Sequence, residues 1–307
     1  MRFGVIDLGT NSIRFDVYEA THKGRETYRI HREKIMVRLG DGLYENGLLQ
    51  PNAMARALAA LESFKLYLDR LEIKKCVTFA TCALRDAANA QDFIAMAKSL
   101  TGLHIEIISG KKEAKLIAKG ILRHTYTPEG IFGLIDIGGG STEISICEKN
   151  RILFSHSFDL GANRLQQVYL KTSPPRSKTA VKELRKHIRD TLKATLKEYE
   201  LPEIKEAMGS SGTIKAMSKI LKKNKEDTEP IKRRSIQTWA ETMEPMKIQK
   251  LLTIEGMEPK RVDQIVSGAI LLDEILKTLS IKKLWFTDFS LREGILAEAI
   301  QKFYRKS

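Results

Sequence analysis

The sequence predicts an α/β protein made of two related domains with a cleft between them, and three observations support this. The segment FGLIDIGGGSTEISICE, which begins at Phe132, repeats FGVIDLGTNSIRFDVYE, which begins at Phe3, at a constant offset of 129. Strand-like and helix-like segments alternate between and after the two copies. A chain of 307 residues is also long for a single compact core.

Each copy of the repeated segment is predicted to form a strand, a tight turn and a second strand. In the first copy, Phe3–Asp7 is a short apolar run, and Ile13 and Phe15 then alternate with polar residues. The turn LGTNS joins two antiparallel strands, whereas the glycines of a P-loop lead into a helix and end in Gly-Lys-Ser/Thr. The second copy repeats this pattern with IFGLID, IGGGS and the alternating Ile144 and Ile146.

The segment between the copies completes the first domain. Pro51–Leu71 carries apolar residues at helical spacing, among them Leu58, Leu61 and Phe64. Further predicted elements follow in chain order: a strand ending in a loop in KKCVTFATCAL, a helix in NAQDFIAMAKSL, a strand in IEIISG, and a helix over about Lys111–Arg123.

The elements after the second copy form the second domain. They are a helix at Asn163–Leu170, a loop with Pro174 and Pro175, a long basic helix, a strand, glycine turn and helix in EAMGSSGTIKAMSKIL, a strand in KLWFTDFS, and a terminal helix from about Leu291. We therefore predict domains at residues 1–124 and 125–307. The terminal helix, about 293–307, is a candidate to pack back on the first domain.

The composition is that of a soluble protein, with 42% hydrophobic and 29% charged residues. No apolar run approaches the roughly 20 residues that span a bilayer. The start of the chain reaches Asp7 at once, unlike the hydrophobic region of a signal peptide. The three cysteines, Cys76, Cys82 and Cys147, are odd in number and lack metal-site spacing, which indicates reduced thiols. We expect a cytoplasmic protein without a membrane partner.

The charge balance indicates a polyanionic partner. The chain has 52 Lys and Arg against 38 Asp and Glu, a net charge of +14. Much of the excess lies in Lys178–Lys197 and Lys219–Arg234. Such a field attracts polyphosphate, phosphorylated nucleotides, nucleic acid or an anionic surface, although a merely solubilising surface explains the charge equally well. Because no nucleic-acid reading motif accompanies the charge, we expect no specific nucleic-acid partner.

The two glycine turns suggest phosphate binding. A turn rich in Gly and Ser leaves backbone N–H groups able to approach an anion closely. An Asp at the preceding strand end can hold a metal ion or its water. For a single turn, a hairpin that needs Gly for positive φ is the favoured explanation. Two copies facing a cleft would instead grip a phosphate chain from both sides.

The motifs resemble a known family. DLGTNS and DIGGGST are similar to the two phosphate motifs of the actin, Hsp70 and sugar-kinase superfamily, and GSSGT at 209–213 is similar to its third glycine motif. FATCALRDAANAQDF, IISGKKEAKLIAKGI, GANRL, RVDQIVSGAILLDEIL and LREGIL narrow the resemblance to the exopolyphosphatase and guanosine pentaphosphate phosphatase (Ppx/GppA) family, in its short two-domain form. The resemblance implies two duplicated ribonuclease H-like (actin-like ATPase) domains.

The resemblance also implies roles for individual residues. Glu113 would be the catalytic base, although a Glu in a first helical turn is also favoured by the helix dipole. Asp7, Asp136 and Glu143 would bind Mg²⁺ or Mn²⁺. The phosphate-binding set would comprise Gly9, Thr10, Asn11, Ser12, Arg14, Arg85, Gly138, Gly139, Gly140, Ser141, Thr142, Gly209, Ser210, Ser211 and Gly212.

Two of the implied phosphate contacts are arginines. When the two copies are aligned, Arg14 of the first corresponds to Glu143 of the second, so that one copy has a cation where the other has a carboxylate. Arg85 offers a planar fork of donors suited to phosphate. A solvent-facing strand residue for Arg14, and a surface arginine capped by an acid for Arg85, are the structural alternatives.

The sequence departs from the family pattern at two positions. Ser290 stands where glycine is more frequent, and Lys112 stands where many members carry a second acid next to the base. The added positive charge at Lys112 could favour long anionic substrates. Neither change removes a residue that the mechanism requires.

The leading functional hypothesis is an exopolyphosphatase that releases orthophosphate from the end of inorganic polyphosphate. A guanosine pentaphosphate (pppGpp) 5′-phosphohydrolase is the alternative with the same chemistry. An ATP-dependent kinase of the same superfamily and a non-enzymatic binder of polyphosphate or alarmone are the other readings. The preferred chain length and cation stay open, and so does a homodimer.

Overall fold

The computed structural model describes residues 1–21, 24–123, 126–171, 176–221 and 229–304. The chain forms two compact units: unit 1 contains residues 1–116 and 291–307, and unit 2 contains residues 117–290. The division falls inside helix α5 (Gly110–Ile121), earlier than the boundary that we placed at residue 124. The reason is that the first half of α5 packs on the terminal helix α12 (Leu291–Tyr304), which belongs to unit 1.

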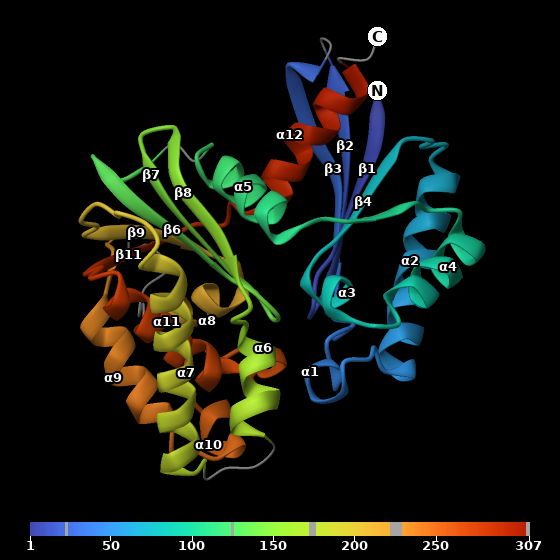
Figure 1. The fold of residues 1–307 in the computed structure, drawn as a ribbon. Helices are drawn as coiled ribbons and strands as arrows, with labels where there is room; N and C mark the ends of the chain where they lie inside the picture. Colours follow the sequence, from blue (N-terminus) through green and yellow to red (C-terminus); the bar gives the residue numbers. More distant parts are fainter. Residues whose placement is uncertain (22–23, 124–125, 172–175, 222–228, 305–307) are drawn as a thin grey trace. The chain divides into compact units, whose positions relative to one another are not determined.

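Unit 1 is built on a five-stranded sheet in the order β3-β2-β1-β4-β5 (Figure 1). Strands β1 (Arg2–Leu8), β2 (Ile13–Thr21) and β3 (Glu26–Ile35) are antiparallel neighbours. Strands β4 (Cys76–Ala80) and β5 (Ile105–Ile107) continue the sheet parallel to β1. Because β1, β4 and β5 run in one direction, their carboxyl ends meet at one edge of the sheet.

The helices of unit 1 bury the apolar faces of this sheet. α2 (Pro51–Arg70) turns Ala57, Leu61, Phe64 and Leu68 inward at helical spacing, and Phe64 stacks on Phe15 of β2 with ring centroids 4.7 Å apart. Three further helices complete this region: α1 (Leu43–Asn46), α3 (Cys82–Asp86) and α4 (Ala90–Thr101).

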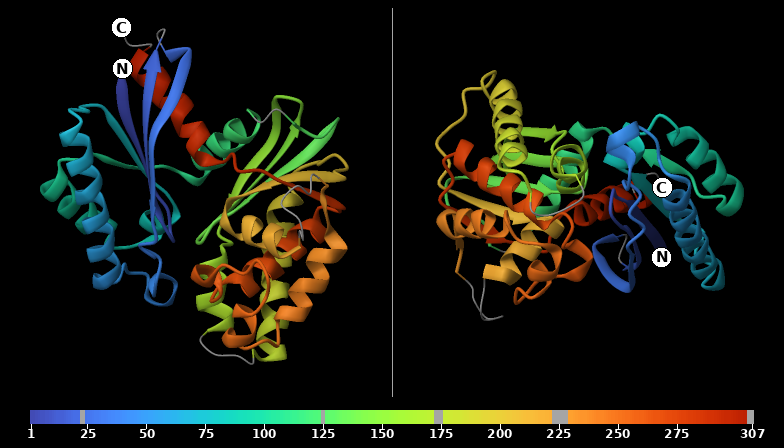
Figure 2. Two further views of the ribbon diagram at one scale, coloured as in Figure 1. Left: turned by 180° about the vertical axis from the view of Figure 1, so that it is seen from behind. Right: turned by 90° about the horizontal axis from the view of Figure 1, so that it is seen from below.

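Helix α12 lies beside the first strands although it ends the described chain (Figures 1 and 2). Phe303 packs on Phe3 with ring centroids 5.4 Å apart, and the Tyr304 hydroxyl donates to the Ala20 carbonyl at 3.0 Å. The terminal helix therefore contributes to the core of unit 1.

Unit 2 contains a six-stranded sheet in the order β10-β11-β9-β6-β7-β8. Its strands are β6 (Ile131–Ile137), β7 (Thr142–Glu148), β8 (Arg151–Phe158), β9 (Glu206–Ser210), β10 (Ile231–Lys232) and β11 (Lys283–Phe286). Strands β6, β9 and β11 are parallel, and β6, β7 and β8 form an antiparallel meander.

The helices of unit 2 surround α11 (Ile265–Thr278), of which residues 265–276 are all buried. The other helices are α6 (Ala162–Leu165), the π-helical turn η2 (Gln166–Leu170), α7 (Lys178–Leu196), α8 (Ser211–Leu221), α9 (Arg233–Met243), α10 (Ile248–Leu252) and the short 3₁₀ turn η3 (Pro259–Arg261). α11 packs against α7 and α9.

The repeat in the sequence is a repeat of structure. β6 begins and ends 129 residues after β1. The strand neighbours also correspond, since a three-stranded antiparallel meander is followed on its open side by parallel strands in both sheets. The prediction of two duplicated α/β domains is confirmed.

A backbone irregularity is repeated as well. The pairing register shifts between Val17 and Tyr18 in unit 1 and between Ile146 and Cys147 in unit 2. The residues skipped on the partner strands, Ile30 and Leu153, are exposed to 42% and 41%. Both hairpins therefore carry a bulge at the same step, with an apolar side chain turned to solvent.

Some elements were predicted wrongly or missed. The segment after β4 forms the short helix α3, not a loop, and the glycine turn predicted in GSSGT is absent because β9 passes directly into α8. The predicted helix at 163–170 is split between α6 and η2. Strands β3 and β8 were missed because neither shows a fully buried face in its sequence. Pro174 and Pro175 lie outside the described residues.

The three cysteines, all in described segments, form no disulfide, and burial raises the pKa of Cys76 and of Cys147 to about 12. Across the described ranges, no helix has both the length and the apolar character required to cross a membrane.

Candidate active site

The second glycine turn, between β6 and β7, directs its carbonyls toward the protein. The carbonyls of Gly138 and Gly139 accept hydrogen bonds from the first backbone N–H groups of α6, and the Gly140 carbonyl accepts from Arg164 Nε at 2.8 Å. In the part of the chain that the structure describes, no hydrogen bond uses the N–H groups of Gly139, Gly140 or Ser141. Three successive donors are thus available to an anion.

Close packing explains two glycines, Gly138 in the turn and Gly161 behind it. None of Gly9, Gly138, Gly139 and Gly140 has a positive φ, so the alternative of an ordinary hairpin that needs left-handed glycines is wrong. A Cβ on Gly138 would stand 3.1 Å from the Ser141 carbonyl oxygen. Gly161 packs directly against the backbone of the turn, because a Cβ there would stand 2.3 Å from the Gly139 carbonyl oxygen.

The first glycine turn, between β1 and β2, has the same construction. Gly9 N–H donates to the Ser12 carbonyl at 3.1 Å, as Gly138 N–H donates to Ser141 at 2.9 Å. The carbonyls of Thr10 and Asn11 accept from Gly40 and Arg38, each at 2.9 Å. Within the described residues, the N–H groups of Thr10 and Ser12 have no partner.

Asp7 and Arg14 face each other at the base of this first turn, as paired residues of β1 and β2. Asp7 is buried, and that burial raises the pKa of its carboxyl above the usual range, while nearby Arg14 and Arg292 oppose the shift. The site therefore has a carboxylate position that favours a bound proton or a nearby cation.

The equivalent positions in unit 2 are both carboxylates. Asp136 of β6 pairs with Glu143 of β7, and both are buried. Ser210, at the end of the neighbouring β9, donates to Asp136 Oδ2, and Ser157 of β8 donates to Glu143 Oε1 at 2.7 Å. Hydroxyl donors fix both side chains at the edge of the glycine turn.

Glu113 lies in the first turn of α5 and is 6% exposed. Its Oε2 accepts from Arg85 Nη1 at 3.0 Å, and the same nitrogen donates to the Ile108 carbonyl at 3.0 Å. Arg85 is thus partly buried and paired with an acid, Glu113. The pair lies inside unit 1, so an interaction with the helix dipole alone does not account for the position of Glu113.

Backbone contacts join this pair to the first turn. Thr81 N–H donates to the Leu8 carbonyl at 3.2 Å, Arg85 N–H donates to Thr81, and Ile108 N–H donates to Ala80 at 3.0 Å. The candidates of unit 1 therefore follow the carboxyl ends of β1, β4 and β5, the end of a parallel sheet where α/β proteins bind ligands.

The third motif has a different structure from the other two. Gly209 and Ser210 end β9, and Ser211, with φ of 75°, begins α8 directly. A Cβ on Gly212 would stand 2.0 Å from an Arg261 guanidinium nitrogen. Gly212 therefore makes room for Arg261, which also contacts Glu258 at 3.3 Å.

Residues 17–303 match the Ppx/GppA phosphatase family. The chain belongs to this family. It is 30% identical over 312 residues to exopolyphosphatase 2 of Mycobacterium tuberculosis, covering 96% of this chain and 97% of the relative. It is 31% identical to the guanosine-5′-triphosphate,3′-diphosphate pyrophosphatase of Pseudoalteromonas translucida, covering 98% of this chain and 60% of that protein.

Solved structures of the family have the same fold. An exopolyphosphatase from Cytophaga hutchinsonii superimposes with a TM-score of 0.86 at 26% identity, covering 98% of each chain. A Ppx/GppA family member from Aquifex aeolicus gives a TM-score of 0.77 at 22% identity, covering 99% of each chain. The predicted family and the actin-like fold class are confirmed, and this Ppx/GppA protein is a phosphoanhydride hydrolase, as predicted.

We predicted the metal ligands from the motifs and not from a cluster of ligand side chains. Among the residues that the structure describes, no three His, Cys, Asp or Glu side chains gather to hold an ion. A pair of carboxylates such as Asp136 and Glu143 still fits Mg²⁺, which typically takes one or two carboxylates and fills its other positions with waters and substrate phosphates.

Sequence reasoning missed two arginines of this Ppx/GppA protein. Arg164 supports the Gly140 carbonyl, and Arg261 lies on Gly212. Both stand in motifs that the resemblance quoted, GANRL and RVDQIVSGAILLDEIL. Neither arginine stands beside a glycine-rich segment in the sequence, and only the fold brings Arg164 to Gly140 and Arg261 to Gly212.

Proposed function

We propose that this protein is an exopolyphosphatase, which hydrolyses the terminal phosphoanhydride of inorganic polyphosphate and releases orthophosphate. The observation that carries the proposal is the buried Glu113 carboxylate, held at 3.0 Å by Arg85 at the carboxyl ends of parallel strands. A buried carboxylate with a fixed orientation is suited to act as a general base.

In the proposed reaction, Glu113 accepts a proton from a water molecule whose oxygen attacks the terminal phosphorus. The new P–O bond forms as the bridging P–O bond breaks, and its electron pair stays on the shortened polyphosphate. Arg85 would orient Glu113 and contact phosphate oxygens. The products are orthophosphate and a chain one unit shorter.

The glycine turns would bind the phosphates. The N–H groups of Gly139, Gly140 and Ser141 can donate to phosphate oxygens, and those of Thr10 and Ser12 can do the same in unit 1. At Gly139 and Gly140, glycine removes side chains that would keep an anion away from the backbone.

Asp136 and Glu143 would hold Mg²⁺ or Mn²⁺ with its waters, and Asp7 would contribute a carboxylate in unit 1. A bound divalent ion would neutralise phosphate charge during the reaction. The hydrogen bonds from Ser210 and Ser157 orient the two carboxylates of unit 2, and both serines would thereby tune affinity for the ion.

The choice of polyphosphate is supported by the net charge of +14 and by relatives named exopolyphosphatase. A specific observation keeps pppGpp as a second candidate, because a relative of 31% identity carries the name of a guanosine pentaphosphate-type pyrophosphatase. Both substrates present a phosphoanhydride end to the same residues.

The test is phosphate release with Mg²⁺ from long-chain polyphosphate, tripolyphosphate, pppGpp and ATP. We expect polyphosphate to be the best substrate and Glu113→Gln to lower kcat by about 10²–10⁴-fold. Glu62→Gln, at an exposed glutamate of α2, is the matched control and should retain full activity. Preference for pppGpp would replace the proposed substrate, and full activity of Glu113→Gln would refute the proposed base.

A further inference from the structure

Helix α7 presents a continuous row of lysines to solvent. Lys178, Lys182, Lys186, Lys193 and Lys197 are all exposed, and they fall within about 100° of the helix circumference at 3.6 residues per turn. The row is about 28 Å long at 1.5 Å per residue. The opposite side of the helix is apolar and buried, with Val181, Leu184, Ile188 and Leu192 facing the core. We call these five residues the α7 lysine row.

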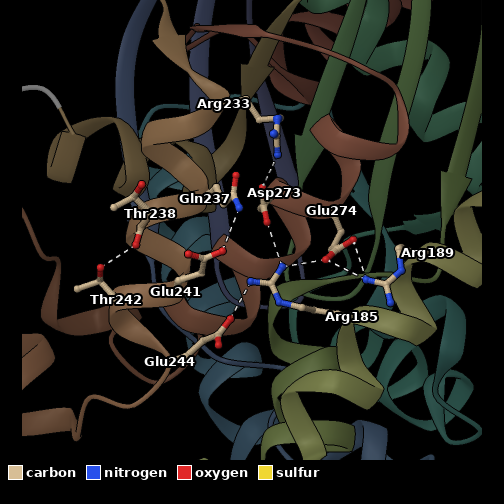
Figure 3. A network of polar contacts seen from close by, with 10 residues as sticks. All are labelled: Arg185, Arg189, Arg233, Gln237, Thr238, Glu241, Thr242, Glu244, Asp273 and Glu274. Carbon is tan, nitrogen blue, oxygen red and sulfur yellow. Dashed lines mark hydrogen bonds and ion pairs between the residues drawn. The ribbon is translucent and has the colours of Figure 1, made fainter. Parts of the chain in front are cut away.

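The α7 lysine row is not neutralised by the protein. None of its five ammonium groups forms an ion pair or hydrogen bond with any residue that the structure describes. The carboxylates nearby are used by arginines of the same helix: Figure 3 shows Arg185 and Arg189 bonded to Glu244, Asp273 and Glu274. The exposed Glu183 and Asp190 flank the row without pairing with it.

The amino-terminal part of the row opposes the stability of the helix. Lys178 lies in the first turn of α7, where the helix dipole disfavours cations and no acid is present, whereas Lys193 in the last turn is favoured. Lys178, Lys182 and Lys186 also repel one another at successive i,i+4 spacings, as do Lys193 and Lys197. A surface that served only solubility would not require the charges in one row.

A cavity of about 910 Å³ lies at the carboxyl-terminal end of the row. Its rim includes Lys193 and Lys197 of α7 and Lys277 of α11, while Leu196, Ile204 and Leu279 supply apolar walls. Asp190 and Glu203 also line it, and cations outnumber acids. Low-dielectric walls concentrate the field of charges at a concave surface and strengthen attraction of a polyanion.

Within unit 2, the cavity and the glycine turn lie at opposite ends of the parallel strands. Ile204 and Ser280 lie at the amino-terminal ends of β9 and β11, whereas Asp136 and Ser210 lie at the carboxyl ends of β6 and β9. A ligand here would therefore contact part of a long substrate that the glycine turn of unit 2 cannot reach.

We infer that the α7 lysine row and the residues lining this cavity bind a stretch of inorganic polyphosphate that the glycine turn of unit 2 does not contact. The inference rests on the proposed function for its choice of substrate. Many closely spaced negative charges match a row of unpaired lysines, and binding releases counterions from both partners. A chain long enough to reach the row gains affinity, and tripolyphosphate does not.

The test compares two triple variants in the Glu113→Gln protein. One changes Lys182, Lys186 and Lys193 to Gln. The matched control changes Lys74, Lys98 and Lys149 to Gln, three exposed lysines outside α7, and alters net charge equally. Binding of fluorescently labelled long-chain polyphosphate is measured over a range of salt concentrations, with tripolyphosphate and single-stranded RNA as further probes.

We expect the α7 triple variant to bind long-chain polyphosphate about tenfold or more weakly and with a smaller salt dependence. The control triple variant and all tripolyphosphate affinities should stay within about twofold, because neither involves the row. Equal losses in both triple variants would reduce the effect to net charge and overturn the inference. So would an unchanged affinity of the α7 variant, or equal α7-dependent affinity for RNA.

The same experiment separates this inference from the proposed function. If the unmodified protein releases no phosphate from polyphosphate, the proposed function fails, yet a loss of binding confined to the α7 variant still supports the lysine row. If hydrolysis occurs and binding ignores the row, the inference fails and the proposed function stands.

Discussion

Gly294 of α12 lies directly against Leu116 of α5: a Cβ on Gly294 would stand 2.1 Å from the Leu116 carbonyl oxygen. The last described helix is thereby pressed onto the helix whose first turn carries Glu113. Lys112 strengthens the contact through ion pairs with Glu106 at 2.9 Å and Glu298 at 3.3 Å. The position of the proposed base thus depends on a segment almost 180 residues away in the sequence.

Gly294→Ala should destabilise the protein by about 1–3 kcal/mol, since the added methyl group meets backbone atoms that cannot rotate away. It should also lower kcat more than it raises KM, because α5 must shift with Glu113. Urea unfolding and steady-state kinetics measure the two effects. Gln301→Ala, at an exposed position of the same helix, should change neither. Unaltered stability of Gly294→Ala would contradict the packing described.

The Arg85–Glu113 pair predicts strong coupling. Arg85→Ala leaves a carboxylate buried without its cation, and we expect a loss of about 2–4 kcal/mol in unfolding free energy. Glu113→Gln should cost less, because the amide oxygen can still accept from Arg85. The double variant should be less destabilised than the sum of the two single variants. Additive losses in a denaturation double-mutant cycle would show that the two side chains do not interact.

Asp7 predicts a pH dependence of stability. Burial raises its pKa, so the folded protein retains a proton that the unfolded chain loses once the pH exceeds about 4. Unfolding free energy should therefore fall as the pH rises from there through the raised pKa. Asp7→Asn should remove this fall and be more stable than the unmodified protein at neutral pH, while losing activity if Asp7 assists a metal ion.

Thermal unfolding between pH 4 and 8 checks this behaviour. Asp16→Asn is the contrasting variant, because Asp16 is paired with Arg32 at 2.9 Å and Arg292 at 3.6 Å. We expect it to destabilise the protein. A steeper pH dependence in Asp7→Asn than in the unmodified protein would oppose the assigned direction.

The ion network in unit 2 predicts which arginine matters most. Arg185 contacts Glu244 at 2.7 Å, Asp273 at 3.0 Å and Glu274 at 2.8 Å (Figure 3). Arg185→Met leaves buried carboxylates without this cation and should lower the free energy of unfolding by about 3–5 kcal/mol. Arg189→Met removes one contact from a more exposed side chain and should cost about 1 kcal/mol. Chemical denaturation would contradict the network if the order were reversed.

The sequence was informative where a local pattern decides the structure. The duplicated hairpins, α2 and the terminal helix follow from apolar spacing and from the repeat at an offset of 129. The sequence was uninformative where pairing with a neighbouring element decides the structure. β3 pairs with β2 although its side chains are mostly exposed, and such an edge strand has no apolar face to detect.

The candidate site divides in the same way. Asp136 and Glu143 could be recognised because each stands at a fixed distance from a glycine turn. The close backbone contacts at Gly138 and Gly161 could not be recognised from the sequence, because only the folded chain brings Gly161 behind Gly139. The roles of Glu113 and Asp7 are predictions that the variants above test, and the roles of the phosphate donors and of Asp136 and Glu143 remain predictions.

The matching bulges carry a consequence for how the two halves of this protein came to differ. Because the shift occurs at Val17/Tyr18 and at Ile146/Cys147, the two hairpins bend at the same step and project corresponding side chains from the same faces. No insertion or deletion separates Arg14 from its counterpart Glu143. The difference in charge between the two turns therefore comes from one side chain on a shared backbone: Asp7 pairs with Arg14 in the first turn, and Asp136 pairs with Glu143 in the second.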